Sequence, residues 1–168
     1  PDGLLDGRTA EIVAYDLDSE GPAFGQRLLA ALTTGPLAGR AVRFRHVAGS
    51  WDDAAALGAV LDTIPAGAVV AATSEGGLFE YGTDQAIVGA LRVLAPRCPV
   101  VTGSVTRDDK LGALLRRQIR ARTVPRGLDR FARLAEAGGY AIARSLQSPL
   151  SDQVLLARSS SGNAASRR

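Results

Sequence analysis

Two hydrophobic periods alternate along this chain. Short, continuous or alternating apolar runs, typical of β-strands, are each followed by a segment whose apolar residues recur every three or four positions, as on a buried helix face. The predicted strands cover residues 12–16, 41–48, 68–73 and 100–105, and the helical patterns after them cover 24–32, 53–64, 84–94 and 109–119. Repeated strand-then-helix units indicate an α/β fold built on a parallel sheet.

The end of the chain departs from this repeat. A fifth helical pattern covers 127–137, and two strands are predicted at 140–145 and 153–157. Only a few residues around Ser148 and Pro149 join these two strands, so they are expected to pair antiparallel. We therefore predict a doubly wound, mostly parallel α/β sheet with helices on both faces and a C-terminal antiparallel hairpin. Residues 1–158 form this domain, and the polar tail 159–168 is expected to be disordered.

The predicted sheet places four strand ends along one edge, which begin at Asp16, Gly49, Thr73 and Gly103. In open parallel sheets the ligand crevice lies at the carboxyl ends of the strands. Asp16 closes the apolar run IVAYD, and a carboxylate at that place can accept both hydroxyls of a ribose. A cap on the following helix is the alternative interpretation of Asp16. The small apolar run AVVAAT before Thr73 is expected to be buried on both faces.

Composition narrows the function classes. The 168 residues include one cysteine, Cys98, and one histidine, His46, which excludes an internal disulfide and a Cys/His zinc site. No apolar run approaches the roughly 20 residues of a membrane span, and a cytoplasmic protein is expected. The net charge of +3 is concentrated in the arginines between Arg116 and Arg133. Such a cluster can meet phosphates, although a solvated helix face is the more ordinary interpretation.

Four motifs in order carry a resemblance: IVAYD at 12–16, HVAGSWDD at 46–53, VVAATSEGGLFEYGTDQAIVGALRVLAP at 69–96, and AEAGGYAIARSLQSPLSDQVLLA at 135–157. Together they resemble the class I S-adenosylmethionine-dependent methyltransferases, from the second strand of that fold to its last. The resemblance implies S-adenosyl-L-methionine as the cofactor. The glycine-rich loop that follows the first strand in that family is not found here. It is expected to precede Pro1, and without its strand the sheet is expected to be poorly stable.

The resemblance also implies a role for individual residues. Asp16, followed by Leu17, would bind the cofactor ribose, and the glycine-acid step of the family is replaced by Gly49 and Ser50. The remaining candidates are Trp51 at the adenine, Thr73 and Ser74 beside the cofactor, and Glu75, Glu80 and Tyr81 as a base or an acceptor clamp.

Methyl transfer to a small molecule is the leading hypothesis, because the Asn/Asp-Pro-Pro-aromatic motif of base methylation is absent after residue 73. A cofactor-free interaction module and an RNA-modifying methyltransferase that uses the Arg116–Arg133 segment stay open. A nicotinamide-dependent oxidoreductase is a further alternative, which the absence of a Tyr-x-x-x-Lys pair disfavours. The expected partner is a small-molecule methyl acceptor, and no association with a membrane is expected. Nucleic acid is disfavoured but stays open, and a homodimer is an open alternative that nothing in the sequence disfavours.

Overall fold

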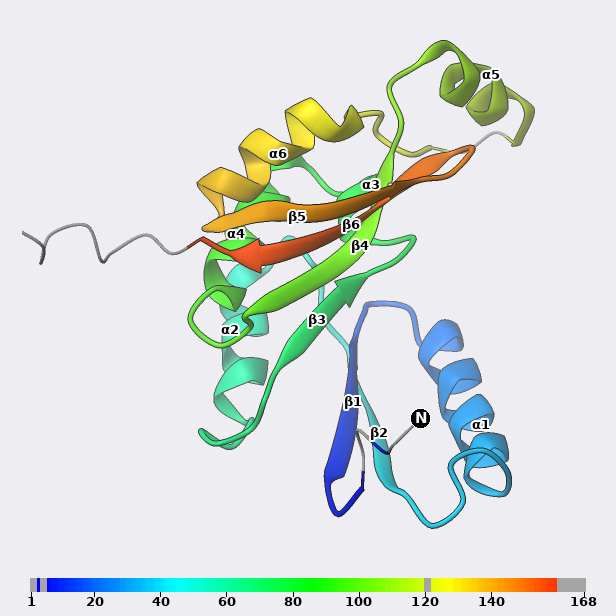
Figure 1. The fold of residues 1–168 in the computed structure, drawn as a ribbon, viewed down its shortest axis with the longest axis vertical. Helices are drawn as coiled ribbons and strands as arrows, with labels where there is room; N and C mark the ends of the chain where they lie inside the picture. Colours follow the sequence, from blue (N-terminus) through cyan, green and yellow to red (C-terminus); the bar gives the residue numbers. More distant parts are fainter. Residues whose placement is uncertain (1–2, 4–5, 120–121, 160–168) are drawn as a thin grey trace, which may run out of the picture. The chain divides into compact units, whose positions relative to one another are not determined.

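The computed structural model of the chain describes residues 3, 6–119 and 122–159. These residues form two compact units, Pro1–Ser50 and Trp51–Arg168. Strand pairing follows the same division, with a two-stranded sheet β1-β2 and a four-stranded sheet β3-β4-β6-β5 (Figure 1). The α/β class is confirmed, and the single sheet that the sequence suggested is divided in two.

The first unit is one strand-helix-strand crossover. It comprises β1 (Thr9–Tyr15), α1 (Glu20–Thr33) and β2 (Ala41–Val47). The two strands pair in parallel along their whole length, from Thr9 opposite Ala41 to Tyr15 opposite Val47. Both strands therefore end at the same edge, and Asp16 is the first residue beyond β1.

The second unit contains the remaining elements. They are α2 (Ala54–Asp62), β3 (Ala71–Ser74), α3 (Leu78–Tyr81), α4 (Asp84–Leu94), β4 (Val100–Thr106), α5 (Lys110–Ile119), α6 (Gly127–Ala137), β5 (Tyr140–Gln147) and β6 (Ser151–Arg158). β3 and β4 are parallel, whereas β6 is antiparallel to both β4 and β5. The predicted C-terminal hairpin is confirmed. Residues 160–168 of the predicted tail lie outside the described residues.

The core of the second unit lies between one face of its sheet and helices α4 and α6. Alternate residues of β4 and β6, among them Val101, Val105 and Leu156, are fully buried against these helices. The ring of Phe79 from α3 meets the ring of Phe131 from α6 with centroids 4.8 Å apart and a tilt of 60°, a favourable aromatic geometry.

The prediction for the third strand needs correction. The run predicted as a strand buried on both faces is shorter, and Ala71 and Thr73 in β3 are exposed. β3 is an edge strand of its sheet, hydrogen-bonded to β4 alone. The glycine-rich stretch between β3 and the predicted helix 84–94 holds a further short helix, α3, which hydrophobic periodicity does not indicate. Burial of Phe79 against Phe131 supports this turn.

Candidate functional site

Asp16 lies where the sequence placed it, at the carboxyl edge of the β1-β2 sheet. Its backbone N–H donates to the Val47 carbonyl at 3.2 Å, and its own carbonyl accepts from the Gly49 N–H at 3.2 Å. Its Oδ1 accepts the Asp18 N–H at 2.9 Å. The residue at the N-cap position of α1 is Ser19, so Asp16 does not cap that helix.

Two side chains that the sequence did not assign to the site hold this edge. His46 Nε2 lies 2.9 Å from the Asp16 carbonyl, and because a carbonyl only accepts, Nε2 must donate. The Tyr15 hydroxyl donates to the Ser50 carbonyl at 2.9 Å, and its ring lies where a Cβ on Gly49 would stand. Both residues fix the backbone that follows β1 and β2. Leu17, by contrast, is 70% exposed.

In the second unit, the chain after β3 is held by serine hydroxyls. Ser74 Oγ accepts the Phe79 N–H at 3.2 Å, and Ser104 Oγ accepts the Gly76 N–H at 3.0 Å. Gly76 has a φ of +61°, a left-handed conformation that glycine adopts without strain. The loop is therefore tied both to α3 and to the neighbouring strand β4.

Trp51 and Thr73 belong to the same part of the second unit. The Trp51 Cζ3 atom lies 3.9 Å from where a Cβ on Gly77 would stand, so the indole borders the loop after β3. Thr102 Oγ1 donates to Thr73 Oγ1 at 3.0 Å across the β3-β4 pair. Trp51, Thr73 and Ser74 are thus brought to the end of β3.

Glu75 and Glu80 lie near each other at this edge. The hydroxyls of Ser104 and Ser151 hydrogen-bond to the Glu80 carboxyl. The side-chain amide of Gln153, oriented with its nitrogen toward Glu75, donates to the Glu75 carboxylate at 2.9 Å. Burial, foremost, and the charge of Glu75 raise the pKa of Glu80, while the hydrogen bonds from Ser104 and Ser151 lower it; the net shift is upward. A carboxyl with a raised pKa is a functional-site candidate.

Three of these partners were missed at the sequence level. Ser104, Ser151 and Gln153 share one face of the sheet, because Thr106 pairs with Ser151 and Ser104 pairs with Gln153. Only the β4-β6 register, a long-range feature, could have revealed them. Tyr81 ends α3 and is 45% exposed.

A buried arginine holds the short helix that carries Glu80. Arg126, with its side chain 1% exposed, donates to the carbonyls of Phe79, at 3.0 Å, and Gly82, and its Nε lies 2.8 Å from Asp84 Oδ1. Arg130 Nη2 lies 2.6 Å from the other carboxylate oxygen of Asp84. Hydrogen bonds from these two arginines lower the pKa of Asp84.

These ion pairs also change the interpretation of the basic segment. Arg126 and Arg130 are bound to Asp84, and Arg116 donates to the Arg107 carbonyl at 2.6 Å. Three of the arginines that suggested a phosphate-binding surface therefore serve contacts within the chain. Arg120 lies outside the described residues.

Two further classes of site are absent from the described part of the chain. It contains no helix long and apolar enough to cross a membrane. Nor do its residues include a group of three or more His, Cys, Asp or Glu side chains suited to a metal ion. Cys98 is buried, and burial raises the pKa of its thiol.

The parallel strand pairs and the reversed last strand fit the class I methyltransferase fold, and comparison with solved structures shows that the chain shares this fold. No protein-family model matches the sequence, and no curated protein matches it. Three similar structures are the O-methyltransferase NcsB1 from neocarzinostatin biosynthesis, the riboflavin-derivative dimethyltransferase RosA from Streptomyces davawensis, and the magnesium protoporphyrin IX methyltransferase ChlM from Synechocystis PCC 6803.

The likeness is one of fold over nearly the whole chain. NcsB1 superposes with a TM-score of 0.57 at 19% identity, RosA with 0.60 at 14%, and ChlM with 0.53 at 13%. Each match covers 92% of this chain, with 43% of NcsB1, 43% of RosA and 77% of ChlM. The chain therefore spans less than half the length of NcsB1 and RosA. The NcsB1 and ChlM structures contain S-adenosyl-L-homocysteine.

Proposed function

We propose that this chain takes part in methyl transfer from S-adenosyl-L-methionine to a small-molecule acceptor. The observation that carries the proposal is the class I methyltransferase fold, shared with structures that contain the demethylated cofactor. The contacts of Arg116, Arg126 and Arg130 within the chain favour a small acceptor over RNA, because they reduce the basic surface that a nucleic acid would need.

The residues of the first unit fit the ribose and adenine of this cofactor. Asp16 is half-buried at a strand end, and only one of its carboxylate oxygens, Oδ1, accepts a hydrogen bond from a described residue. Oδ2 is thus left to accept a ribose hydroxyl. Gly49 and Ser50, whose backbone Tyr15 fixes, would border the adenine, with Leu17 beside Asp16.

Within the second unit, Trp51, Thr73 and Ser74 at the end of β3 are the remaining candidates for cofactor contacts. The cofactor itself supplies the activated methyl group. The protein must align a nucleophile with it and exclude water, and positioning of this kind can lower a barrier by roughly 7–11 kcal/mol.

Glu80 is the best-supported proton acceptor for a hydroxyl or amine of the acceptor. Its raised pKa and its hydrogen bonds to Ser104 and Ser151 suit a positioned carboxyl that takes up a proton. Glu75, held by Gln153, would help to orient the acceptor, and Tyr81 is the remaining candidate nearby.

Calorimetric titration of the full chain with S-adenosyl-L-homocysteine tests the cofactor assignment. We expect binding in the micromolar range, and at least about tenfold weaker binding by Asp16→Ala, because charge-assisted hydrogen bonds each contribute about 1.5–3 kcal/mol. Asp18→Asn is the matched control, since it removes a neighbouring charge and should leave the affinity within about threefold.

Failure to bind, in a chain whose circular dichroism shows it folded, would overturn the cofactor assignment and favour the interaction module. Equal losses in the Asp16 and Asp18 variants would show that local charge, rather than a ribose contact, governs the affinity.

A further inference from the structure

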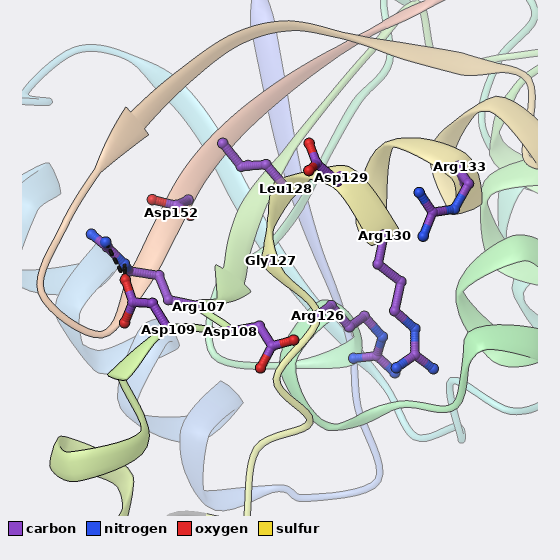
Figure 2. Close-up of a pocket in the computed structure, with 10 residues that line it drawn as sticks. All are labelled: Arg107, Asp108, Asp109, Arg126, Gly127, Leu128, Asp129, Arg130, Arg133 and Asp152. Atoms are coloured by element: carbon purple, nitrogen blue, oxygen red, sulfur yellow. Dashed lines mark hydrogen bonds and ion pairs between the residues drawn. The ribbon is translucent and has the colours of Figure 1, made fainter. Parts of the chain in front are cut away.

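A polar cavity of about 500 Å³ lies at the carboxyl end of β4 in the second unit. Figure 2 shows its lining, which comes from the loop after β4, the start of α6 and the beginning of β6. The proposed methyl-transfer site does not use its residues as ligands. The residues that line the cavity are Arg107, Asp108, Asp109, Arg126, Gly127, Leu128, Asp129, Arg130, Arg133 and Asp152.

Asp152 is the unusual residue of this cavity. It is 7% exposed, and its side chain makes no hydrogen bond or ion pair with any described residue. Asp152 pairs with the buried Val105, so its side chain faces the helix-covered side of the sheet. Its neighbours Ser151 and Gln153 face the opposite side of the sheet, where the Glu75–Glu80 cluster lies. Burial raises the pKa of Asp152, against the opposing charge of Arg107. Among the described residues, the fully buried side-chain atoms without a partner are the hydroxyls of Thr106 and Thr123, so the Asp152 carboxylate meets the cavity, where a ligand could pair with it.

Arg107, which directly follows β4, is already bound to other groups of the chain. Its Nε donates to Asp109 at 2.8 Å, and its Nη1 donates to the Ser148 carbonyl at 3.1 Å. With the Gln147 amide oriented so that its oxygen faces the guanidinium, that oxygen also accepts a hydrogen bond from Arg107. Asp109 also accepts the Gly112 N–H at 2.7 Å. The Arg107–Asp109 pair is therefore neutral and complete, and it leaves Asp152 without a partner.

The remaining charges of the cavity are unequal. Arg126 and Arg130 are bound to Asp84, which is not part of the lining. Four charged side chains among the described lining residues make no hydrogen bond or ion pair. They are the carboxylates of Asp108, Asp129 and Asp152 and the guanidinium of Arg133. Because Arg126 and Arg130 share the single Asp84 carboxylate, the charges at this cavity, Asp84 included, leave a net excess of one negative charge, and Asp152 is its buried carboxyl.

We propose that this cavity binds an organic amine, with the ligand's ammonium group paired to Asp152. A metal ion is disfavoured because no group of three or more potential ligands occurs among the described residues. An ammonium group supplies both the charge and the hydrogen-bond donors that a buried carboxylate needs. The proposal goes beyond methyl transfer and does not depend on it.

Benzylamine is a suitable probe, with benzyl alcohol and benzoate as its neutral and anionic equivalents. In a titration of the ¹⁵N-labelled full chain, benzylamine should shift the amide signals of Asp109, Gly127 and Asp152, and it should bind at least about tenfold more tightly than benzyl alcohol. Asp152→Asn keeps the shape and removes the charge, so it should weaken benzylamine binding by at least about tenfold. The matched control Asp129→Asn, an exposed residue of the same cavity, should change it by less than about threefold.

A second variant keeps the test decisive if Asp152→Asn fails to fold. Arg133→Gln removes the unengaged guanidinium from an exposed position, and we expect it to strengthen benzylamine binding by about twofold or more. Equal binding of benzylamine and benzyl alcohol would overturn the proposal. So would unchanged affinity in a folded Asp152→Asn variant, or weaker binding by Arg133→Gln.

Discussion

The two units share the same strand-helix alternation but differ in what they bury. Apart from Pro22 in α1, every buried hydrophobic side chain of the described residues belongs to the Trp51–Arg168 unit, where Phe131, Leu91 and Leu156 have no exposed surface. In the Pro1–Ser50 unit, the apolar residues predicted to form inner faces stay accessible, with Ile12 at 47% and Phe24 at 62% exposure. The same hydrophobic pattern thus accompanies two different degrees of burial.

This difference separates two kinds of information in the sequence. Hydrophobic periodicity indicates which side of an element can be buried, but the number of neighbouring strands decides whether it is. Parallel sheets occur almost only with both faces covered, and two strands alone are marginally stable. Asp16 therefore belongs to the unit with less burial, and Glu80 to the unit with a core. Ligand binding at Asp16 is expected to stabilise the first unit.

The comparison is tested most strongly by two matched phenylalanine substitutions. Phe131→Ala should lower the free energy of unfolding by about 3–5 kcal/mol, because it leaves a cavity beside Phe79 in a packed core. Phe24→Ala removes an exposed ring from α1 and should cost less than about 1 kcal/mol. Urea denaturation followed by circular dichroism and by the fluorescence of Trp51, the sole tryptophan, measures both.

A loss of similar size in both variants would show that the first unit has a core of its own, and the contrast between the units would then be wrong. A small loss for Phe131→Ala would contradict the packing of α6 against α3.

A smaller effect is expected at the arginines that hold α3. Arg126→Gln should cost about 3 kcal/mol, because it leaves two carbonyls and the Asp84 carboxylate without the buried guanidinium. Arg130→Gln removes a half-exposed partner of the same carboxylate and should cost less than about 1 kcal/mol. Thermal denaturation of both variants makes the comparison. Equal costs would show that the burial of Arg126 contributes nothing beyond a surface ion pair.

Much of the fold was predictable from local patterns. The strand ending before Asp16, the α4 segment and the C-terminal hairpin follow from periodicity, charge and a short connection. α3 was not predictable, since a four-residue helix between glycines is fixed by tertiary contacts of Phe79 and Arg126.

The candidate site shows the same limit. The carboxylates at strand ends, Asp16 and Glu75, could be named from sequence, because strand ends are local features. Their partners could not, because His46 reaches Asp16 across the β1-β2 pair, while Ser104 and Ser151 reach Glu80 through the β4-β6 register.

The smallest predicted effect concerns the pH dependence of the second unit. Because the pKa of Glu80 is raised in the folded chain, its stabilising contribution is present below the unfolded pKa and is lost as pH rises through the folded value. Glu80→Gln cannot ionise, so its stability relative to the wild type should improve as pH rises from about 4 to about 7. Asp84 and Asp109, whose pKa values are lowered, act in the opposite sense, but they are common to both proteins and cancel in the difference. Urea midpoints at the two pH values provide the measurement.

Glu75→Gln, which removes the neighbouring charge, should change the pH dependence of stability in the same direction but by less. Parallel pH profiles for the wild type and Glu80→Gln would contradict the burial of the Glu80 carboxyl.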